Sequence, residues 1–203
     1  YVLARDYGFA PNPFGPFCTL ATCKPQIRRS GEPGDWVVGT GAKHEHGSNA
    51  LVFAMRVSER LTFDDYWSDP RFHYKKPVMN GSLKLMYGDN IYFRNNGHWQ
   101  QLDSHHSNPD GTPNPHNVRR DTQYPFVLIS DHFYFFGQNA VSIPACFRRG
   151  GQRHICKRGV GFRCNFPDAF LSAFIQWLED YHEPGYHGDP ARFTSFERYD
   201  GVS

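Results

Sequence analysis

Short apolar runs alternate along this chain with long polar stretches rich in Gly and Pro, which is the pattern of β-strands joined by loops. Such runs predict strands at residues 1–4, 36–40, 51–57, 126–130 and 132–136. We expect the second and third of these strands to pair antiparallel, and the last two to pair with each other. Asn95-Asn96-Gly97 is a turn sequence, and it predicts a hairpin between residues 90–93 and 99–102.

Two segments carry helix signals instead. Thr62 is a good N-cap with acidic residues after it, which favours a short helix over residues 62–67. Apolar side chains recur every three to four residues after Pro167, and this spacing predicts an amphipathic helix from Asp168 to Tyr181.

These elements predict an α+β fold in which the strands form a small mixed or antiparallel β-barrel with long loops. We expect a core domain over residues 1–143 and an extension over residues 144–203, made of a basic loop and the C-terminal helix packed on the core. The chain has 203 residues, which is enough to bury a hydrophobic core without disulfide staples.

Charge and cysteine content indicate which partners and which redox compartment suit the protein. The formal net charge is only +2 at pH 7, so any contact with nucleic acid must rest on a local patch. Five scattered cysteines, an odd number, fit a reducing compartment better than a disulfide framework. No signal-peptide pattern or membrane-length apolar run is present in the sequence. We therefore expect a cytoplasmic protein with no membrane contact, whose natural chain begins upstream of Tyr1.

The densest polar chemistry lies in the loops before Trp36 and on the strand that starts there. A flat base needs an aromatic face for stacking, polar groups for its edge and cations for phosphate. Trp36 and Phe14 would stack, Asn12 and the threonines would read the base edge, and the basic residues would meet phosphate. The predicted base or nucleotide site comprises Arg5, Asn12, Phe14, Thr19, Thr22, Lys24, Arg28, Arg29, Trp36, Thr40 and Gly41. The same pattern also fits a packed loop with a solvated basic face.

Four further residues are candidates for catalysis: Asp6, Cys18, His105 and Asp131. A nearby cation such as Lys24 would lower the pKa of the Cys18 thiol and activate it as a nucleophile. The run DSHHS contains two histidines that could act as general acid or base, and we expect only one of them to join a site because strand neighbours point to opposite faces. A buried thiol and a loop held by side-chain hydrogen bonds are the structural alternatives.

No metal and no cofactor is predicted. Four residues separate Cys18 from Cys23, which is not the spacing of a zinc ribbon, and the other cysteines are distant and irregularly spaced. GxGxxG, GxxxxGK[ST], GxSxG and HExxH are missing from the sequence, which disfavours dinucleotide redox enzymes, P-loop enzymes, α/β-hydrolases and zincins.

Eight motifs carry a family resemblance: RDYGFAPNPFG, CTLATCKPQIRR, GDWVVGTG, LVFAMRV, DPRF, GDNIY, DSHHS and VLISDHFYFFG. Through them, residues 1 to 140 resemble the family called nucleotide modification associated domain 2. The resemblance implies association with phage and bacterial systems that modify or handle DNA bases. GDWVVGTG followed by LVFAMRVSERLTFDDYWSDP is also similar to PUA-like domains of the EVE and ASCH kind, which implies a PUA-like barrel that holds a modified base or binds RNA.

Three functions follow from these observations. The first is recognition of a modified nucleotide or of a base flipped out of DNA, in a base-modification or phage-defence system. The second is an enzyme that modifies or removes that base, favoured by the long loop over residues 8–17 and the insertion around residues 73–120. The third is a protein-interaction module that uses the C-terminal helix. The expected partner is DNA or a nucleotide, with RNA as the alternative.

Overall fold

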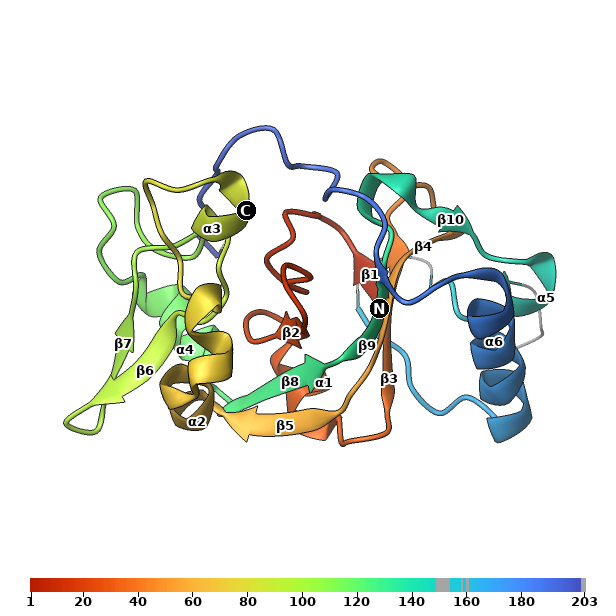
Figure 1. Cartoon of the computed structure of the whole chain (residues 1–203), viewed down its shortest axis with the longest axis horizontal. Helices are drawn as coiled ribbons and strands as arrows, with labels where there is room; N and C mark the ends of the chain where they lie inside the picture. The colour runs from red at the N-terminus through yellow and green to blue at the C-terminus, as the bar shows by residue number, and fades with distance from the viewer. Residues whose placement is uncertain (149–153, 158, 160, 202–203) are drawn as a thin grey trace.

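Three β-sheets and several short helices build the molecule, which confirms the predicted α+β class (Figure 1). The computed structural model describes residues 1–148, 154–157, 159 and 161–201. Two of the sheets occupy the middle of the view, while α5 and α6 lie at one end and the β6–β7 hairpin with α2, α3 and α4 lies at the other.

The strands fall into sheets of six, three and two members. The largest holds β1 (Val2–Leu3), β3 (Trp36–Gly41), β4 (Ala50–Arg56), β9 (His132–Phe135) and β11 (Gly185–Tyr186) in that order, with β10 (Val141–Ser142) beside β4. The second has the order β2 (Cys18–Leu20), β8 (Phe126–Ser130) and β5 (Glu59–Thr62). β6 (Tyr92–Asn95) and β7 (His98–Gln101) form the predicted hairpin.

The pairing of the described strands does not close into a barrel. β1 and β11 stand at the two ends of the main path through the six-stranded sheet, and neither pairs with the other. β3 and β4 do pair antiparallel as predicted, and β1 runs parallel to β3. The PUA-like barrel is therefore not confirmed.

The expected pairing of residues 126–130 with residues 132–136 is wrong, although both segments are strands. β8 pairs with β2 and β5, whereas β9 pairs with β4 and β11. Only Asp131 separates β8 from β9, and a hairpin needs a turn of at least two residues. The chain therefore passes from one sheet into the other at this point instead of reversing.

The helices are mostly short. They are α1 (Pro25–Ser30), α2 (Phe63–Ser68), η1 (Pro70–Lys75), α3 (Leu83–Met86), α4 (Pro115–Asp121), η2 (Gly137–Asn139), α5 (Ala145–Arg148) and α6 (Asp168–Tyr181). The predicted cap is confirmed, because the Thr62 side chain accepts a hydrogen bond from the backbone N–H of Asp65. Helix α6 has its predicted bounds, while residues 149–153 and 158 of the expected basic loop lie outside the described residues.

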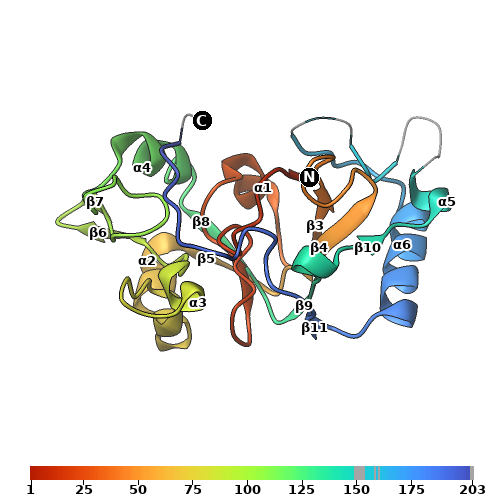
Figure 2. The same cartoon turned by 90° about the horizontal axis from the view of Figure 1, so that it is seen from above.

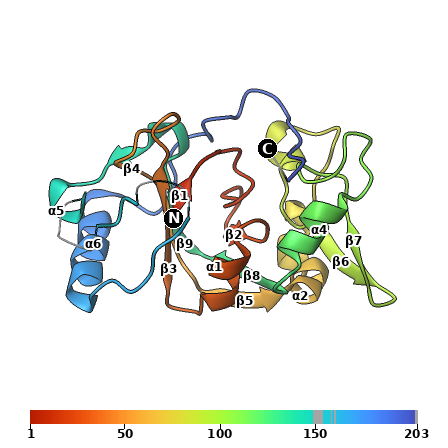
Figure 3. The ribbon, with the colours of Figure 1, turned by 180° about the vertical axis from the view of Figure 1, so that it is seen from behind.

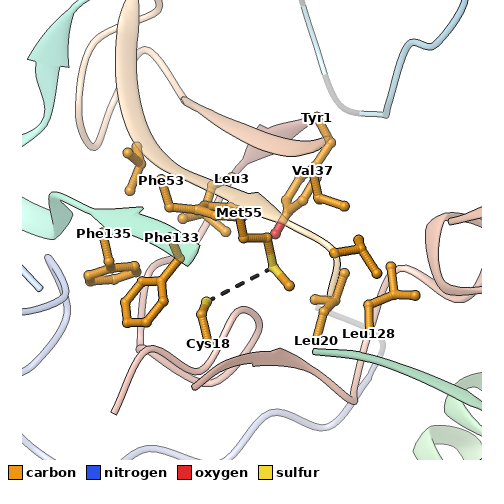
Figure 4. Close-up of a cluster of buried hydrophobic side chains, with 12 residues drawn as sticks. Tyr1, Leu3, Cys18, Leu20, Val37, Phe53, Met55, Leu128, Phe133 and Phe135 are labelled. Carbon is orange, nitrogen blue, oxygen red and sulfur yellow. Dashed lines mark hydrogen bonds between the residues drawn. The ribbon is translucent and has the colours of Figure 1, made fainter. Parts of the chain in front are cut away.

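Strands β4 and β9 are apolar except for Arg56 and His132 at one end, because both faces of each strand are buried. Phe53 and Met55 face the cluster between the two larger sheets, which Figure 4 shows, whereas Ala54 faces a second cluster under α6. Phe133 and Tyr134 of β9 divide between the same two clusters, following the two-residue period of a strand. Helix α6 completes its own cluster with Phe174 and Leu178, both fully buried.

The last described residues return across the molecule after α6. Strand β11 adds to the edge of the six-stranded sheet beside β9, and the chain then crosses to the end that carries α3 and α4 (Figures 2 and 3). The backbone N–H of Tyr199 donates to the carbonyl of His105 at 2.7 Å, which fixes this crossing. Among the described residues, no helix has the length and apolar character needed to cross a membrane.

Candidate functional site

A tight turn between β2 and α1 presents Cys23. The φ angles of Cys23 and Lys24 are 55° and 38°, in the left-handed region that costs a residue with a side chain about 1–3 kcal/mol. Pro25 occupies the first turn of α1, where its fixed φ suits a helix start. Strain of this kind persists only where the surroundings hold it, and here the Cys23 N–H donates to Asp121 Oδ1 at 3.0 Å.

His106 lies in the loop after β7, with its ring between the thiol and a carboxylate. Its Nε2 is 3.6 Å from Cys23 Sγ, and its Nδ1 is 2.7 Å from Asp121 Oδ2. Its backbone carbonyl accepts hydrogen bonds from the side chains of Gln101 and Asn117 at 3.1 and 2.9 Å. These bonds fix the loop, so the imidazole is oriented from both its backbone and its ring.

Asp121 is the last residue of α4, and its side chain is fully buried. Besides His106 and the Cys23 N–H, it accepts a hydrogen bond from the Tyr92 hydroxyl at 3.0 Å. Helix α4 is aimed at this point by its cap, because the Asn114 side chain accepts from the backbone N–H groups of His116 and Asn117. The carboxylate on α4 is thus held by three other segments of the fold: the turn at Cys23, strand β6 and the loop after β7.

The three side chains shift one another's pKa values toward an ion pair. Burial lowers the pKa of His106, but the Asp121 carboxylate and Cys23 outweigh it and raise that pKa to about 9. Burial raises the pKa of Cys23, but the charge and hydrogen bond of His106 lower it below its ordinary value. Burial raises the pKa of Asp121, and His106, Arg120 and Arg28 bring it down to about 2. The carboxylate of Asp121 and the imidazolium of His106 are therefore the favoured forms near neutral pH, and the imidazolium shifts Cys23 toward its thiolate.

This arrangement matches the chemistry of an activated nucleophile. A thiolate attacks, an adjacent imidazole moves protons, and a buried carboxylate orients the imidazole and stabilises its charge. We name Cys23, His106 and Asp121 the catalytic-type triad.

The same three residues are also a donor set for a metal ion. One donor atom from each lies within 4.8 Å of the others, and thiolate, imidazole and carboxylate are ligands of Zn²⁺. The two ring nitrogens of His106 nevertheless face different partners, because Nδ1 is bonded to Asp121 and Nε2 faces Cys23. A linear order of thiol, imidazole and carboxylate suits proton transfer better than one shared ion.

Sequence reasoning chose other residues for catalysis, and the structure places those apart from the triad. Cys18 is fully buried and points toward Met55 in the core, and burial raises its pKa to about 12 (Figure 4). Asp6 is buried beside His46, with 3.3 Å between Oδ2 and Nε2. His105 stacks next to His106, but its Nδ1 donates to the Glu197 carbonyl at 2.5 Å, while Asp131 is exposed in the link between β8 and β9.

Three of the predicted base-reading residues are hydrogen-bonded within the protein, whereas the buried Thr22 hydroxyl has no partner among the described residues. Thr19 donates to Asp89 at 2.6 Å, and Asn12 donates to the Tyr87 carbonyl at 2.9 Å. Thr40 donates to the Tyr1 carbonyl, and Gly41 lies so close to the backbone of Gly47 that a side chain would not fit. These residues, together with buried Phe14 and Thr22, form a packed interior and not an open pocket.

The predicted phosphate contacts differ from one another. Arg28 is fully buried, so it does not meet phosphate. Its guanidinium instead donates to the backbone carbonyls of Cys23, Asp121, Tyr124 and Phe126. Arg29 is exposed and donates to the Tyr124 hydroxyl at 3.2 Å. Lys24 and Arg5 lie on aromatic rings near the triad, with Lys24 Nζ 4.7 Å from the Tyr1 ring centre.

Trp36 lies on a separate open surface. A groove of about 720 Å³ runs between β3, α1 and α6, lined by Trp36, Tyr1 and Ile27 among others. The Trp36 ring stacks on Tyr134 with the ring centres 6.3 Å apart. Trp36 is therefore the one predicted stacking residue that lines a groove, while Phe14 does not.

The sequence does carry a signal for the triad that our reasoning missed. A strand, a two-residue turn and a helix starting with proline surround Cys23 in the run LATCKP, a pattern that displays a nucleophile. Helix α1 has only six residues, too few for a helical repeat of apolar side chains to be visible in the sequence. No sequence pattern links Cys23 to His106 and Asp121, which lie 83 and 98 residues further along.

Fold and site together define an α+β protein in which a half-buried cysteine, a buried histidine and a buried aspartate are linked in series. The family model for nucleotide modification associated domain 2 matches residues 1–197. The chain therefore belongs to that family, as its motifs predicted, and the match extends past residue 140 through α6 and the returning tail. Neither the curated proteins nor the solved structures gave a match to this chain.

Proposed function

We propose that this protein is a cysteine-dependent enzyme of a nucleotide modification system, with Cys23 as nucleophile. The observation that carries the proposal is the His106 imidazole, bonded at 2.7 Å to a buried carboxylate on one side and 3.6 Å from a thiol on the other. A histidine held in this way can exchange a proton with the thiol and with a leaving group. The family supports a nucleotide-related substrate.

The reaction class that suits these residues is acyl transfer or hydrolysis. The Cys23 thiolate attacks an electrophilic carbon and forms a sulfur–carbon bond, and His106 gives its proton to the departing group. Water or an acceptor amine then attacks the same carbon and gives a proton to neutral His106. The sulfur–carbon bond breaks, and the thiolate and imidazolium are restored without an oxidant or reductant.

Product analysis with a matched cysteine control tests this proposal. The protein is incubated with modified DNA, unmodified DNA and free nucleotides, and the nucleosides are analysed by mass spectrometry. We expect a change in nucleoside mass that Cys23→Ala abolishes and that Cys146→Ala, which removes an exposed thiol, leaves intact. Full conversion by the Cys23→Ala protein would refute thiol catalysis.

The triad's metal-donor geometry gives an additional outcome to the same experiment. Activity that a chelator removes and Zn²⁺ restores would assign the three side chains to a metal site in place of covalent catalysis. Unchanged activity in the chelator supports the thiol route.

The groove beside Trp36 favours a second candidate, recognition of a base without chemistry. The side chains of Tyr1, Trp36 and Arg56 line an open surface, which suits stacking on a base and contact with phosphate. Trp36→Ala should then weaken binding to modified DNA by about 1–3 kcal/mol, the usual contribution of one stacked base. The matched control is Trp67→Ala, because Trp67 stacks on Phe93 away from the groove. Equal affinity of both variants and the unaltered protein would reject this candidate.

The protein-interaction function has weaker support. The apolar face of helix α6 is already buried within the protein, where Phe174 and Leu178 pack in the cluster under α6. Its most exposed large apolar side chain is Tyr181, at 73%.

A further inference from the structure

Two arginines share one aromatic ring beside the triad. The Arg5 guanidinium lies 5.0 Å from the centre of the Tyr199 ring, and the Arg120 guanidinium lies 5.4 Å from it. The same ring lies 5.7 Å from the ring of His106. The returning C-terminal segment therefore brings an aromatic ring to the triad, and Arg5 from the loop after β1 and Arg120 from α4 place two positive charges beside that ring.

Lys24 adds a third positive charge next to the nucleophile. It follows Cys23 in the left-handed turn, and its ammonium lies over the Tyr1 ring at 4.7 Å.

These cations are not fully used inside the protein. Arg120 Nη2 is buried and has no hydrogen-bond partner among the described residues, although Arg120 Nε reaches Asp121 at 3.4 Å. The ion pairs within the described part of the chain involve neither Arg5 nor Lys24. A buried donor without a partner is costly, so a ligand atom that accepts from Arg120 would be stabilising.

We propose that Arg5, Lys24 and Arg120 form a phosphate-binding subsite that holds a nucleotide with its reactive group over Cys23, with Tyr199 as the stacking surface. The inference rests on the proposed function and names its substrate class. Arginine guanidinium groups bind phosphate through paired hydrogen bonds, and a lysine adds a point charge.

Two alkylating reagents of different charge test the subsite at Cys23 itself. Iodoacetamide is neutral and reports thiol activation, while iodoacetate is anionic and also reports attraction of an anion. Rates at Cys23 and at exposed Cys146 are read from the same sample by peptide mass spectrometry. We expect the iodoacetate to iodoacetamide rate ratio at Cys23 to exceed that at Cys146 by about fivefold or more at low salt, and to fall with added salt.

Matched arginine variants separate the subsite from the general charge. Arg5→Gln should bring the ratio at Cys23 toward that at Cys146, while Arg29→Gln should leave it unchanged because Arg29 is exposed against Tyr124. Equal ratios at Cys23 and Cys146, together with fast iodoacetamide alkylation of Cys23, would overturn the subsite but leave the triad standing. Slow iodoacetamide alkylation of Cys23 would instead overturn the proposed function.

Protection by nucleotides identifies the source of the phosphate. Deoxycytidine monophosphate, deoxycytidine, inorganic phosphate and a short single-stranded oligonucleotide are each added before iodoacetamide. Stronger protection of Cys23 by the monophosphate than by the nucleoside supports the subsite. If the oligonucleotide protects Cys23 even more strongly than the monophosphate, the phosphate belongs to a polynucleotide. Equal protection by nucleoside and monophosphate overturns it.

Discussion

Replacing Asp121 with asparagine perturbs the triad at its most buried point. Asparagine has nearly the same shape and keeps one acceptor oxygen, but it removes the negative charge beside His106. That charge is the main influence that opposes burial and raises the pKa of His106 from 6.5 to about 9. The rise corresponds to about 3 kcal/mol in favour of the imidazolium. Without it, burial dominates and the ring becomes neutral at pH 7.

The expected result is a loss of thiol reactivity at neutral pH. A neutral His106 no longer lowers the pKa of Cys23, and an ordinary thiol is only a few per cent thiolate at pH 7. Iodoacetamide should therefore modify Cys23 more slowly at pH 7 in the Asp121→Asn protein, by up to about 30-fold, the factor between full thiolate and a few per cent. Its rate should rise only above about pH 8.5, because burial raises the pKa of Cys23 once the imidazolium is lost.

The assay follows peptide masses from pH 5 to 10, with exposed Cys146 as the reference thiol in the same chain. Asp131→Asn is the matched control, because it removes an exposed carboxylate from the link between β8 and β9. Thermal unfolding of both variants shows whether the fold is retained. An Asp121→Asn protein that is folded and alkylates at the unaltered rate would refute the triad, as would a Cys23 that titrates like Cys146 in the unaltered protein.

Three further predictions concern stability. Because folding raises the pKa of His106 from 6.5 to about 9, its charge stabilises the fold by about 3 kcal/mol below about pH 6.5, and this stabilisation disappears as the pH rises through 9. Urea unfolding of His106→Asn and of the unaltered protein should show that their difference in unfolding free energy shrinks over this pH range. A difference that stays constant with pH would contradict the prediction. Arg28→Met leaves buried carbonyls without donors and should lower the unfolding free energy in urea by about 3–5 kcal/mol. Arg29→Met, at an exposed site, should change it by less than about 0.5 kcal/mol, and similar losses for both variants would contradict a structural role of Arg28. Thr62→Ala removes the cap of α2 and should cost about 1 kcal/mol in the same assay, a loss that Thr62→Ser should largely restore.

The local elements were predictable wherever one short segment decides them. Residues 168–181 form a helix because their apolar side chains repeat at helical spacing, and residues 95–97 form a turn because Asn96 and Gly97 accept positive φ angles of 50° and 78°. Strand pairing was less predictable because it depends on distant segments. β8 and β9 adjoin in sequence, yet the partners of β9 are β4 and the distant β11.

Burial decides where the predicted site residues lie, and burial is not visible in a polar loop. Cys18 and Cys23 look equivalent in the sequence, but Cys18 belongs to strand β2 and points into the core, whereas Cys23 lies in the turn beyond it. Arg28 likewise looks like a phosphate contact in the sequence. It lies one turn into helix α1, and its guanidinium donates to the backbone carbonyls of Tyr124 and Phe126 at the start of β8. A polar stretch of sequence can therefore supply the inner supports of a site as well as its surface.

The paired histidines show most directly why environment and not residue type assigns the roles. His105 and His106 are adjacent and their rings are 5.4 Å apart, yet burial and the neighbouring His106 lower the pKa of His105 to about 3, while Asp121 and Cys23 overcome burial and raise that of His106 to about 9. His105 is neutral, and its Nδ1–H donates to the Glu197 carbonyl, so it competes for neither the carboxylate nor the thiolate. The positive charge is confined to the ring that contacts Cys23. Two neighbouring titratable groups with widely separated pKa values are the usual mark of an acid and base assignment, and here they leave His106 alone in reach of the nucleophile.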